Sequence, residues 1–185
     1  MTARVFAGWD FSEKEVVKPD FAAQGHARGV PMGGDLTAAP DGVAPTFMVR
    51  APRDPDGANL DRIQIVKGWL ETDDGSFHEK VYDIAWAGDR ALGSDGKLPA
   101  VGITAEGATY TNDIGAALVA GWWQDPHFDP NERALYYLRV LEIPTPTWLA
   151  YDKAFYGDEI QLPEDALLIH RERAYTSPIW YTPKS

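Results

Sequence analysis

Apolar and polar residues alternate along several short stretches of this chain, a pattern typical of β-strands that turn one face to a core. The alternation is strongest over residues 133–143, where successive side chains would point to opposite faces of a sheet. Residues 60–71 also alternate, but both of their faces are partly apolar, which predicts a central strand. The run Asp73–Gly75 predicts a hairpin turn before another strand at residues 77–87.

Further strands are predicted at residues 4–9, 45–51, 101–104, 108–112, 114–124 and about 174–181. In the last of these, Pro178 would interrupt the hydrogen bonds of the ladder. Residues 116–118 would also tolerate a helix, but turn signals on both sides of the segment favour a strand. About seven to eight short strands with few helices predict an all-β fold, an antiparallel β-sandwich of the immunoglobulin-like kind.

Two long stretches lack a clear period. Residues 10–43 are rich in Gly, Pro and Asp, and residues 144–173 form an excursion rich in aromatic residues. An irregular segment of this length is unusual in a compact domain, so the first stretch is expected to be functional, disordered or packed on a missing partner. No internal repeat or linker divides the chain, and a single domain over residues 1–185 is predicted.

The composition supports a folded β domain and narrows its partners. Hydrophobic residues make up 44% of the 185 residues and aromatic residues 12%, which is enough to build a core. The net charge of −11 repels phosphate backbones and anionic lipid surfaces, so neither nucleic acid nor a membrane is expected as a partner. The chain has no Cys, which excludes disulfide bonds, thiol catalysis and Cys-ligated zinc.

Residues that could carry catalysis do not group in the sequence. The four histidines lie far apart and show no metal-binding motif: His26, His78, His127 and His170. Ser177 precedes a proline and has no nucleophile-elbow glycines around it. The chain alone is therefore not expected to be an enzyme, and the opposite hypothesis would require the histidines to converge with carboxylates in a pocket.

A ligand-binding module is the alternative to a catalytic or structural role. Oxygen-bearing residues alternate through the turn that contains Gly57, which is what calcium requires, at Asp54, Asp56, Asn59 and Asp61. The competing interpretation is an ordinary β-turn, because no Glu closes the loop. Exposed tryptophans could also stack on a sugar ring, the candidates being Trp122, Trp123, Trp148 and Trp180, although core packing is commoner for this residue.

Three arginines near the end of the chain need partners if they are buried. Arg139 stands in the middle of an apolar strand, and Arg171 and Arg173 precede the last strand. A structural network with carboxylates such as Glu142 and Glu172 is favoured. Binding of an anionic substrate is the alternative.

Four segments carry a resemblance to a known family: GVPMGGDL at residues 29–36, DPDGANLDR at 54–62, RVLEIPTP at 139–146 and RERAYTSPIWYT at 171–182. They resemble the C-terminal region of the domain of unknown function 3604 family, over nearly the whole chain. Members of that family carry a PHP-type (polymerase-and-histidinol-phosphatase-like) metallohydrolase domain upstream of this region. The resemblance implies that the divalent metals and the catalytic part lie in that upstream domain and that no cofactor is bound here, calcium at residues 54–61 excepted.

The resemblance also implies a partner, which is the upstream catalytic domain of the same, bacterial parent protein. The chain is expected to be a non-catalytic accessory domain that packs on this hydrolase and shapes its cleft. The residues expected at the interface are Gly33, Gly34, Asp35, Trp123 and Trp148. Without the partner, a homodimer through the same surface is a further expectation. The parent is expected in the periplasm or another extracytoplasmic location.

Overall fold

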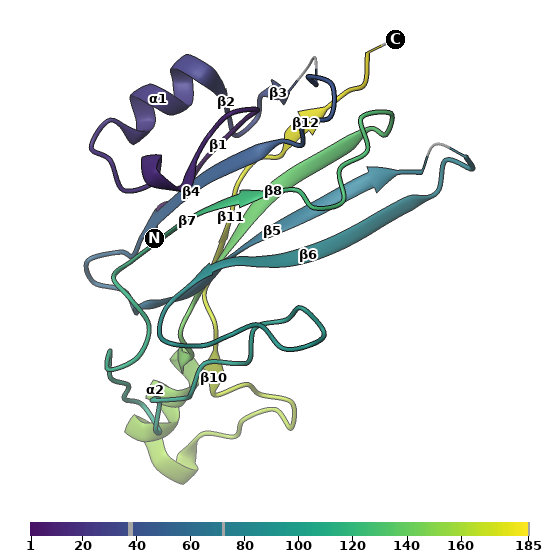
Figure 1. The fold of residues 1–185 in the computed structure, drawn as a ribbon. Helices are drawn as coiled ribbons and strands as arrows, with labels where there is room; N and C mark the ends of the chain where they lie inside the picture. The colour runs from purple at the N-terminus through teal and green to yellow at the C-terminus, as the bar shows by residue number, and fades with distance from the viewer. Residues whose placement is uncertain (37–38, 72, 185) are drawn as a thin grey trace.

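Two β-sheets pack face to face in the computed structural model, which describes residues 1–36, 39–71 and 73–184 (Figure 1). The smaller sheet has the order β2-β1-β4-β7, formed by β2 (Gly29–Pro31), β1 (Arg4–Gly8), β4 (Thr46–Pro52) and β7 (Leu118–Gln124). The larger sheet has the order β3-β12-β8-β5-β6, formed by β3 (Asp35–Leu36), β12 (Ile179–Tyr181), β8 (Ala134–Glu142), β5 (Leu60–Leu70) and β6 (Phe77–Trp86), with β11 (Arg173–Tyr175) also paired to β8. The predicted all-β sandwich is confirmed, and the immunoglobulin-like assignment stays a prediction.

The core lies between the two sheets and follows from the period-two alternation of their strands. Inward side chains of β1, β4 and β7 meet those of β5 and β8 in one cluster of buried residues. At the open edge of the sandwich, β7 approaches β6 so closely that a Cβ on Gly121 would stand 2.8 Å from the Cβ of Ala85. A side chain at position 121 would therefore push the two sheets apart.

The smaller sheet is covered on its other face by the segment that precedes β2. This segment contains the 3-10 helix η1 (Glu13–Glu15) and the helix α1 (Phe21–Arg28). Phe21 of α1 packs on Phe6 of β1 with ring centroids 5.5 Å apart, and Met48 of β4 completes the cluster. Residues 10–43 were expected to be irregular, but this stretch contains η1 and α1, and helix α1 packs on the chain's own sheet.

Two short strands near the C-terminus, β11 and β12, pair with the same edge of β8. β12 pairs with the first residues of β8 and β11 with later ones, and Ser177 and Pro178 separate them. Pro178 therefore interrupts the ladder as predicted, and residues 174–181 form two strands where one was expected. Thr176 restores the connection, because its hydroxyl accepts a hydrogen bond of 3.0 Å from the Leu138 amide.

A small subdomain extends from one end of the sandwich (Figure 1). It consists of β9 (Thr145–Pro146), β10 (Ile169–His170), α2 (Trp148–Tyr156) and the 3-10 helix η2 (Gly157–Glu159). The predicted irregular excursion after residue 144 is thus partly helical. The strands predicted at 101–104 and 108–112 were wrong, because this stretch holds only an isolated bridge between Glu106 and Thr109. In the described part of the chain, no helix has the length and apolar character required to cross a bilayer.

Candidate functional site

The candidate functional site lies on the outer face of the larger sheet. Alternate residues of β8 point there, and their cross-strand partners on β5, β6, β11 and β12 share that face. One end of the face is aromatic and apolar, and the other end is rich in arginine.

The apolar end is a hollow of about 290 Å³ beside strand β12. Phe77 is 60% exposed and Trp180 is 46% exposed, and both line the hollow with Leu135. The absence of a side chain at Gly68 creates the space, because a Cβ there would stand 2.9 Å from the Phe77 ring. Two large rings therefore remain at the surface on either side of a strand pair that has only small or aliphatic residues between them.

The cationic end is organised by one carboxylate, Asp61, whose side chain is completely buried. Asp61 Oδ2 accepts hydrogen bonds from Arg62 Nε at 3.0 Å and from Arg171 at 3.2 Å. Asp61 Oδ1 accepts one from Arg90 at 2.6 Å. A single negative charge thus holds three guanidinium groups in place.

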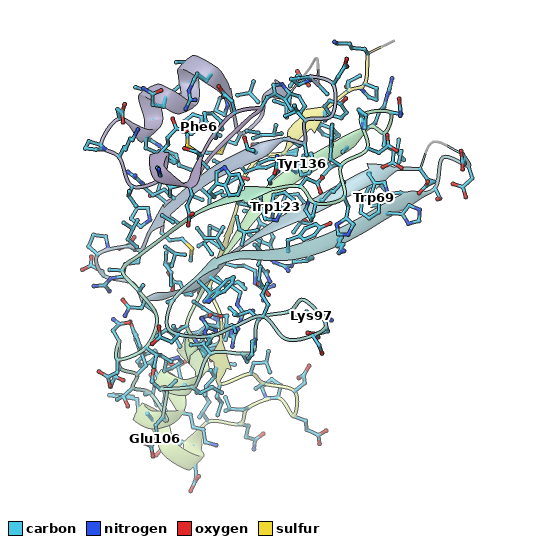
Figure 2. All side chains as sticks on the ribbon, viewed as in Figure 1. Phe6, Trp69, Lys97, Glu106, Trp123 and Tyr136 are labelled. Carbon is cyan, nitrogen blue, oxygen red and sulfur yellow. The ribbon has the colours of Figure 1, made fainter. Side chains whose placement is uncertain are left out.

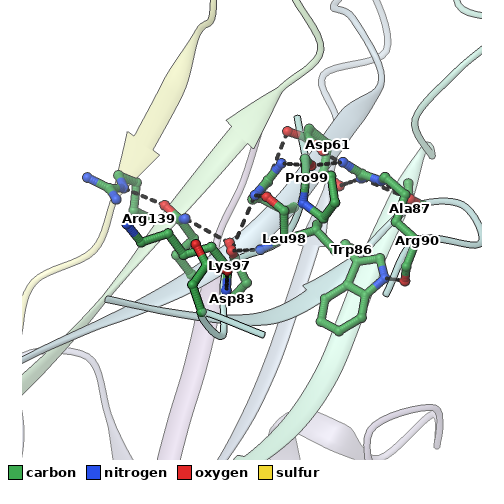
Figure 3. Close-up of polar contacts among 12 residues, drawn as sticks. Asp61, Asp83, Trp86, Ala87, Arg90, Lys97, Leu98, Pro99 and Arg139 are labelled. Atoms are coloured by element: carbon green, nitrogen blue, oxygen red, sulfur yellow. Dashed lines mark hydrogen bonds and ion pairs between the residues drawn. The ribbon is translucent and has the colours of Figure 1, made fainter. Parts of the chain in front are cut away.

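A second chain of contacts extends from this cluster across the sheet (Figure 3). Arg62 Nη1 lies 3.3 Å from Asp83 Oδ2, and the other oxygen of Asp83 accepts from the Gln64 amide at 2.7 Å. Gln64 Oε1 in turn accepts from Arg139 Nε at 2.7 Å. The loop after β6 closes the cluster, because Arg62 also donates to the carbonyl oxygens of Leu98 and Pro99. These partly buried contacts fix the orientation of Arg139, whose free end points away from the cluster in Figure 3.

The hollow beside this network has a volume of about 400 Å³ and four arginines in its lining, which is formed by Arg62, Gln64, Leu98, Ala100, Arg139, Leu141, Arg171 and Arg173. Tyr175 pairs with Arg139 across the strands and stands near the hollow. A hydrogen bond from Arg173 and the positive charges of Arg173 and Arg139 lower the pKa of the Tyr175 phenol. The field at this end of the face is therefore positive, although the chain as a whole carries −11.

A second polar centre lies between the sheets, in the core. Lys67 is 2% exposed, and its Nζ lies 2.7 Å from Asp125 Oδ2. The same oxygen accepts the Tyr136 hydroxyl at 2.8 Å, and Asp125 Oδ1 accepts the His127 amide at 2.9 Å. Burial and, next, the charge of Asp125 raise the pKa of the neighbouring Tyr82 to about 12. Every polar group of this centre has a protein partner, so it is built as a structural anchor.

This buried centre was not predicted from the sequence, although the sequence contains a signal for it. Lys67 alternates in register with Ile63 and Ile65 on the strand that was predicted at residues 60–71. A lysine on the core face of a central strand should have predicted a buried carboxylate partner.

The residues predicted at an interface are not brought together as one group. Gly33 and Gly34 form the turn before Asp35, and this turn bonds to the last strand through Gly33 N to Pro178 O and Trp180 N to Gly34 O, each at 3.0 Å. The turn is thus next to Trp180 and the apolar hollow.

Two further interface candidates lie elsewhere. Trp123 points between the sheets, where its ring stands 5.5 Å from that of Phe47 and 4.9 Å from that of Tyr82 (Figure 2). Trp148 begins α2 at the opposite end of the molecule from β12 and is 69% exposed (Figure 1). The predicted tryptophans therefore do not form a row of exposed indoles.

The turn at residues 54–61 is held by contacts within the protein. Asp54 Oδ1 accepts the amide of Asp56 at 3.0 Å, as in an Asx-turn. Asn59 donates its side-chain amide to the carbonyl oxygens of Asn112 and Ile114. Asp61 faces the arginines, so the four candidate ligands do not point to one centre, and calcium binding at this turn stays a prediction.

The four histidines are scattered as their spacing in the sequence suggests. His26 packs edge-on against Phe6, His78 stacks on Trp69, and His127 Nδ1 lies 3.2 Å from the Tyr82 hydroxyl. His170 pairs with Glu172 at 3.1 Å. Within the described ranges, no three or more His, Cys, Asp or Glu residues are grouped so that they could hold a metal ion.

Comparison with known proteins supports the resemblance found in the sequence. The model of a family described as protein of unknown function (DUF3604) matches residues 1–183. Neither the curated proteins nor the solved structures contain a significant match to the chain. With nearly its whole length matched, the chain belongs to the DUF3604 family.

Proposed function

We propose that this chain is a non-catalytic accessory domain of a PHP-like metal-dependent hydrolase, and that it packs on the catalytic domain of the same parent protein. The observation that carries the proposal is the apolar hollow on the outer face, with the exposed rings of Phe77 and Trp180. Aromatic anchors in a small-residue hollow are the kind of feature that dominates the binding energy of protein interfaces.

The proposed occupant of this surface is the PHP-type domain that resembling proteins carry upstream. The turn of Gly33 and Gly34 is hydrogen-bonded to the strand that presents Trp180, so a segment already expected at the interface lies beside the hollow. The smaller sheet, in contrast, has its outer face covered by α1. In this proposal the divalent metals and the reaction belong to the catalytic domain, and this chain covers part of its cleft.

Hydroxyl-radical footprinting tests the proposal, since it measures how accessible individual side chains are to solvent. The chain alone is compared with a full-length family member that has the same residues at the positions of Phe77 and Trp180. Both rings should react several-fold more slowly in the full-length protein. Leu118 on β7 is the internal control, because it is 53% exposed on the smaller sheet and should react equally in both.

The chain alone is measured at a concentration at which light scattering reports a monomer, because a homodimer would protect the same rings. Equal reactivity of Phe77 and Trp180 in the two proteins would overturn the proposal. Protection of Trp148 in the full-length protein would extend the interface to α2, as the sequence predicted.

A further inference from the structure

The arginine-rich end of the outer face carries more positive charges than buried carboxylates. Docking of a partner at the apolar end does not require this excess. We propose that the hollow lined by Arg139, Arg171 and Arg173 binds a tetrahedral oxyanion, the phosphate or sulfate group of a small ligand. This site is separate from the apolar hollow, and its existence does not depend on the accessory role proposed above.

The pairing of the strands places the arginines around one point. Arg173 and Arg62 both stand opposite Leu141, on the two sides of β8. Arg139 is two residues from Leu141 on the same face, so it is the diagonal neighbour of both at about 7–8 Å between Cα atoms. Long side chains reach one another over this distance, and the hollow of about 400 Å³ lies among them.

The exposed arginines have donors that the protein does not use. Arg139 donates through Nε to Gln64 and also contacts the Tyr175 phenol, and Arg171 donates through Nη1 to Asp61. Arg173 has no carboxylate partner among the described residues, and its contact with the Tyr175 phenol lowers that group's pKa. Each guanidinium presents up to five N–H groups, so several forked donors remain for a ligand.

The charge balance also favours an anion. Arg62, Arg90, Arg139, Arg171 and Arg173 are five positive groups, and the buried carboxylates among them are two, Asp61 and Asp83, which leaves an excess of three positive charges. Like charges on neighbouring strands destabilise a sheet, and this chain has 28 acidic residues with which it could have paired them. The excess is therefore explained by a ligand rather than by stability.

A tetrahedral dianion fits this arrangement better than a carboxylate does. A carboxylate presents two oxygens in one plane, whereas a phosphate or sulfate group presents oxygens in tetrahedral directions. The second kind of group matches donors that come from Arg139 on β8, Arg173 on β11 and Arg171 just before β11. Arg62 and Arg90 are engaged by Asp61 and by backbone carbonyls and act as the rigid base of the site. Arg139, oriented by Gln64, then contacts the ligand directly.

Isothermal titration of the chain with sodium phosphate, sulfate and acetate, at constant ionic strength set by sodium chloride, tests the site. Phosphate or sulfate should bind with one site per chain, and acetate should bind at least about tenfold more weakly. Arg139→Gln and Arg173→Gln should each weaken phosphate binding about tenfold or more, because each removes charge-assisted hydrogen bonds. Arg133→Gln, at the apolar end of the same face, is the matched control and should leave binding unchanged.

Thermal unfolding verifies that the variants fold. The pKa of Tyr175 shows whether phosphate binds beside Arg139 and Arg173. Bound phosphate should move the pKa of Tyr175 back towards its ordinary value, because it offsets the arginine charges, as followed by phenolate absorbance. Phenyl phosphate distinguishes a free ion from an ester: tighter binding than inorganic phosphate assigns the site to an ester ligand, and equal binding to the ion. The proposal is overturned if phosphate and sulfate bind no better than acetate, or if Arg133→Gln weakens binding as much as the other two variants.

Discussion

Replacing Lys67 by methionine is predicted to be one of the most destabilising single substitutions in this protein. Met matches the length of the lysine stem, so the packing of the core is largely kept and the change removes mainly the charge. What remains is Asp125, whose side chain is fully buried and loses a partner at 2.7 Å. The carbonyl oxygen of His127 also loses its donor, which stood at 2.6 Å.

The size of the loss in stability depends on the hydrogen bonds that Asp125 keeps. Asp125 keeps two hydrogen bonds, from the Tyr136 hydroxyl and the His127 amide, so its charge is still partly satisfied. Removing one partner of a buried ion pair costs about 3–5 kcal/mol. For a domain of this length each kcal/mol lowers Tm by about 2–4 °C, which predicts a fall of about 10 °C.

Urea unfolding followed by circular dichroism measures this free energy, and a double-mutant cycle isolates the pair. Asp125→Asn and the combination Lys67→Met with Asp125→Asn complete the cycle, and the double variant should recover at least about 1 kcal/mol relative to additivity. Asp10→Asn is the matched control, since Asp10 pairs with Arg28 at the surface and is worth at most about 1 kcal/mol. A cost below about 1 kcal/mol for Lys67→Met, with no coupling in the cycle, would refute the reasoning.

Three further substitutions test other parts of the fold. Gly25→Ala should destabilise by about 1–3 kcal/mol in urea unfolding, because its Cβ would stand 2.3 Å from the Phe6 ring; a gain, as helix propensity alone predicts, would contradict this packing. Asp61→Asn should cost about 3–5 kcal/mol, since three guanidinium groups lose their shared charge, and a neutral result would show that solvent replaces it. Tyr82→Phe should reduce the loss of stability between pH 10 and 12. Native Tyr82 stays protonated up to about pH 12 whereas the unfolded chain releases that proton near pH 10, so stability falls with pH there, and equal slopes for both proteins would exclude this contribution.

The sheets were predictable because their strands alternate over many residues. Residues 133–143 predicted β8 within one residue at each end, and the expected central strand at residues 60–71 is β5. The helix α1 was not predictable in the same way. Its one large buried side chain is Phe21, and the other buried residues of the covering cluster lie outside the helix, at Phe6, Phe11, Val16 and Met48. A helix of eight residues that depends on so few contacts leaves no period to detect.

At the candidate site, the local sequence identified the arginines but not their distant partners. The sequence singled out Arg139, Arg171 and Arg173, and the expected carboxylate partners were Glu142 and Glu172. The observed partner of Arg171 is Asp61, which is 110 residues away in the chain and was assigned to a calcium turn. Pairings of this kind depend on the register between distant strands, which no local pattern contains.

From the outward residues of β8 we infer that a partner covers this face in the working protein. An antiparallel strand with one face in solvent normally places polar residues on that face. The outward positions of β8 are instead Leu135, Tyr137, Arg139 and Leu141, with a single charge among them. That charge is held by Gln64 and lines the cationic hollow. Coverage of the whole face by one partner would bury Arg139 and leave its remaining donors without acceptors, at a cost of about 1–3 kcal/mol or more. An anion at the cationic end removes that cost, so docking at Trp180 and anion binding at Arg139 are compatible on one face, and each can be lost without the other.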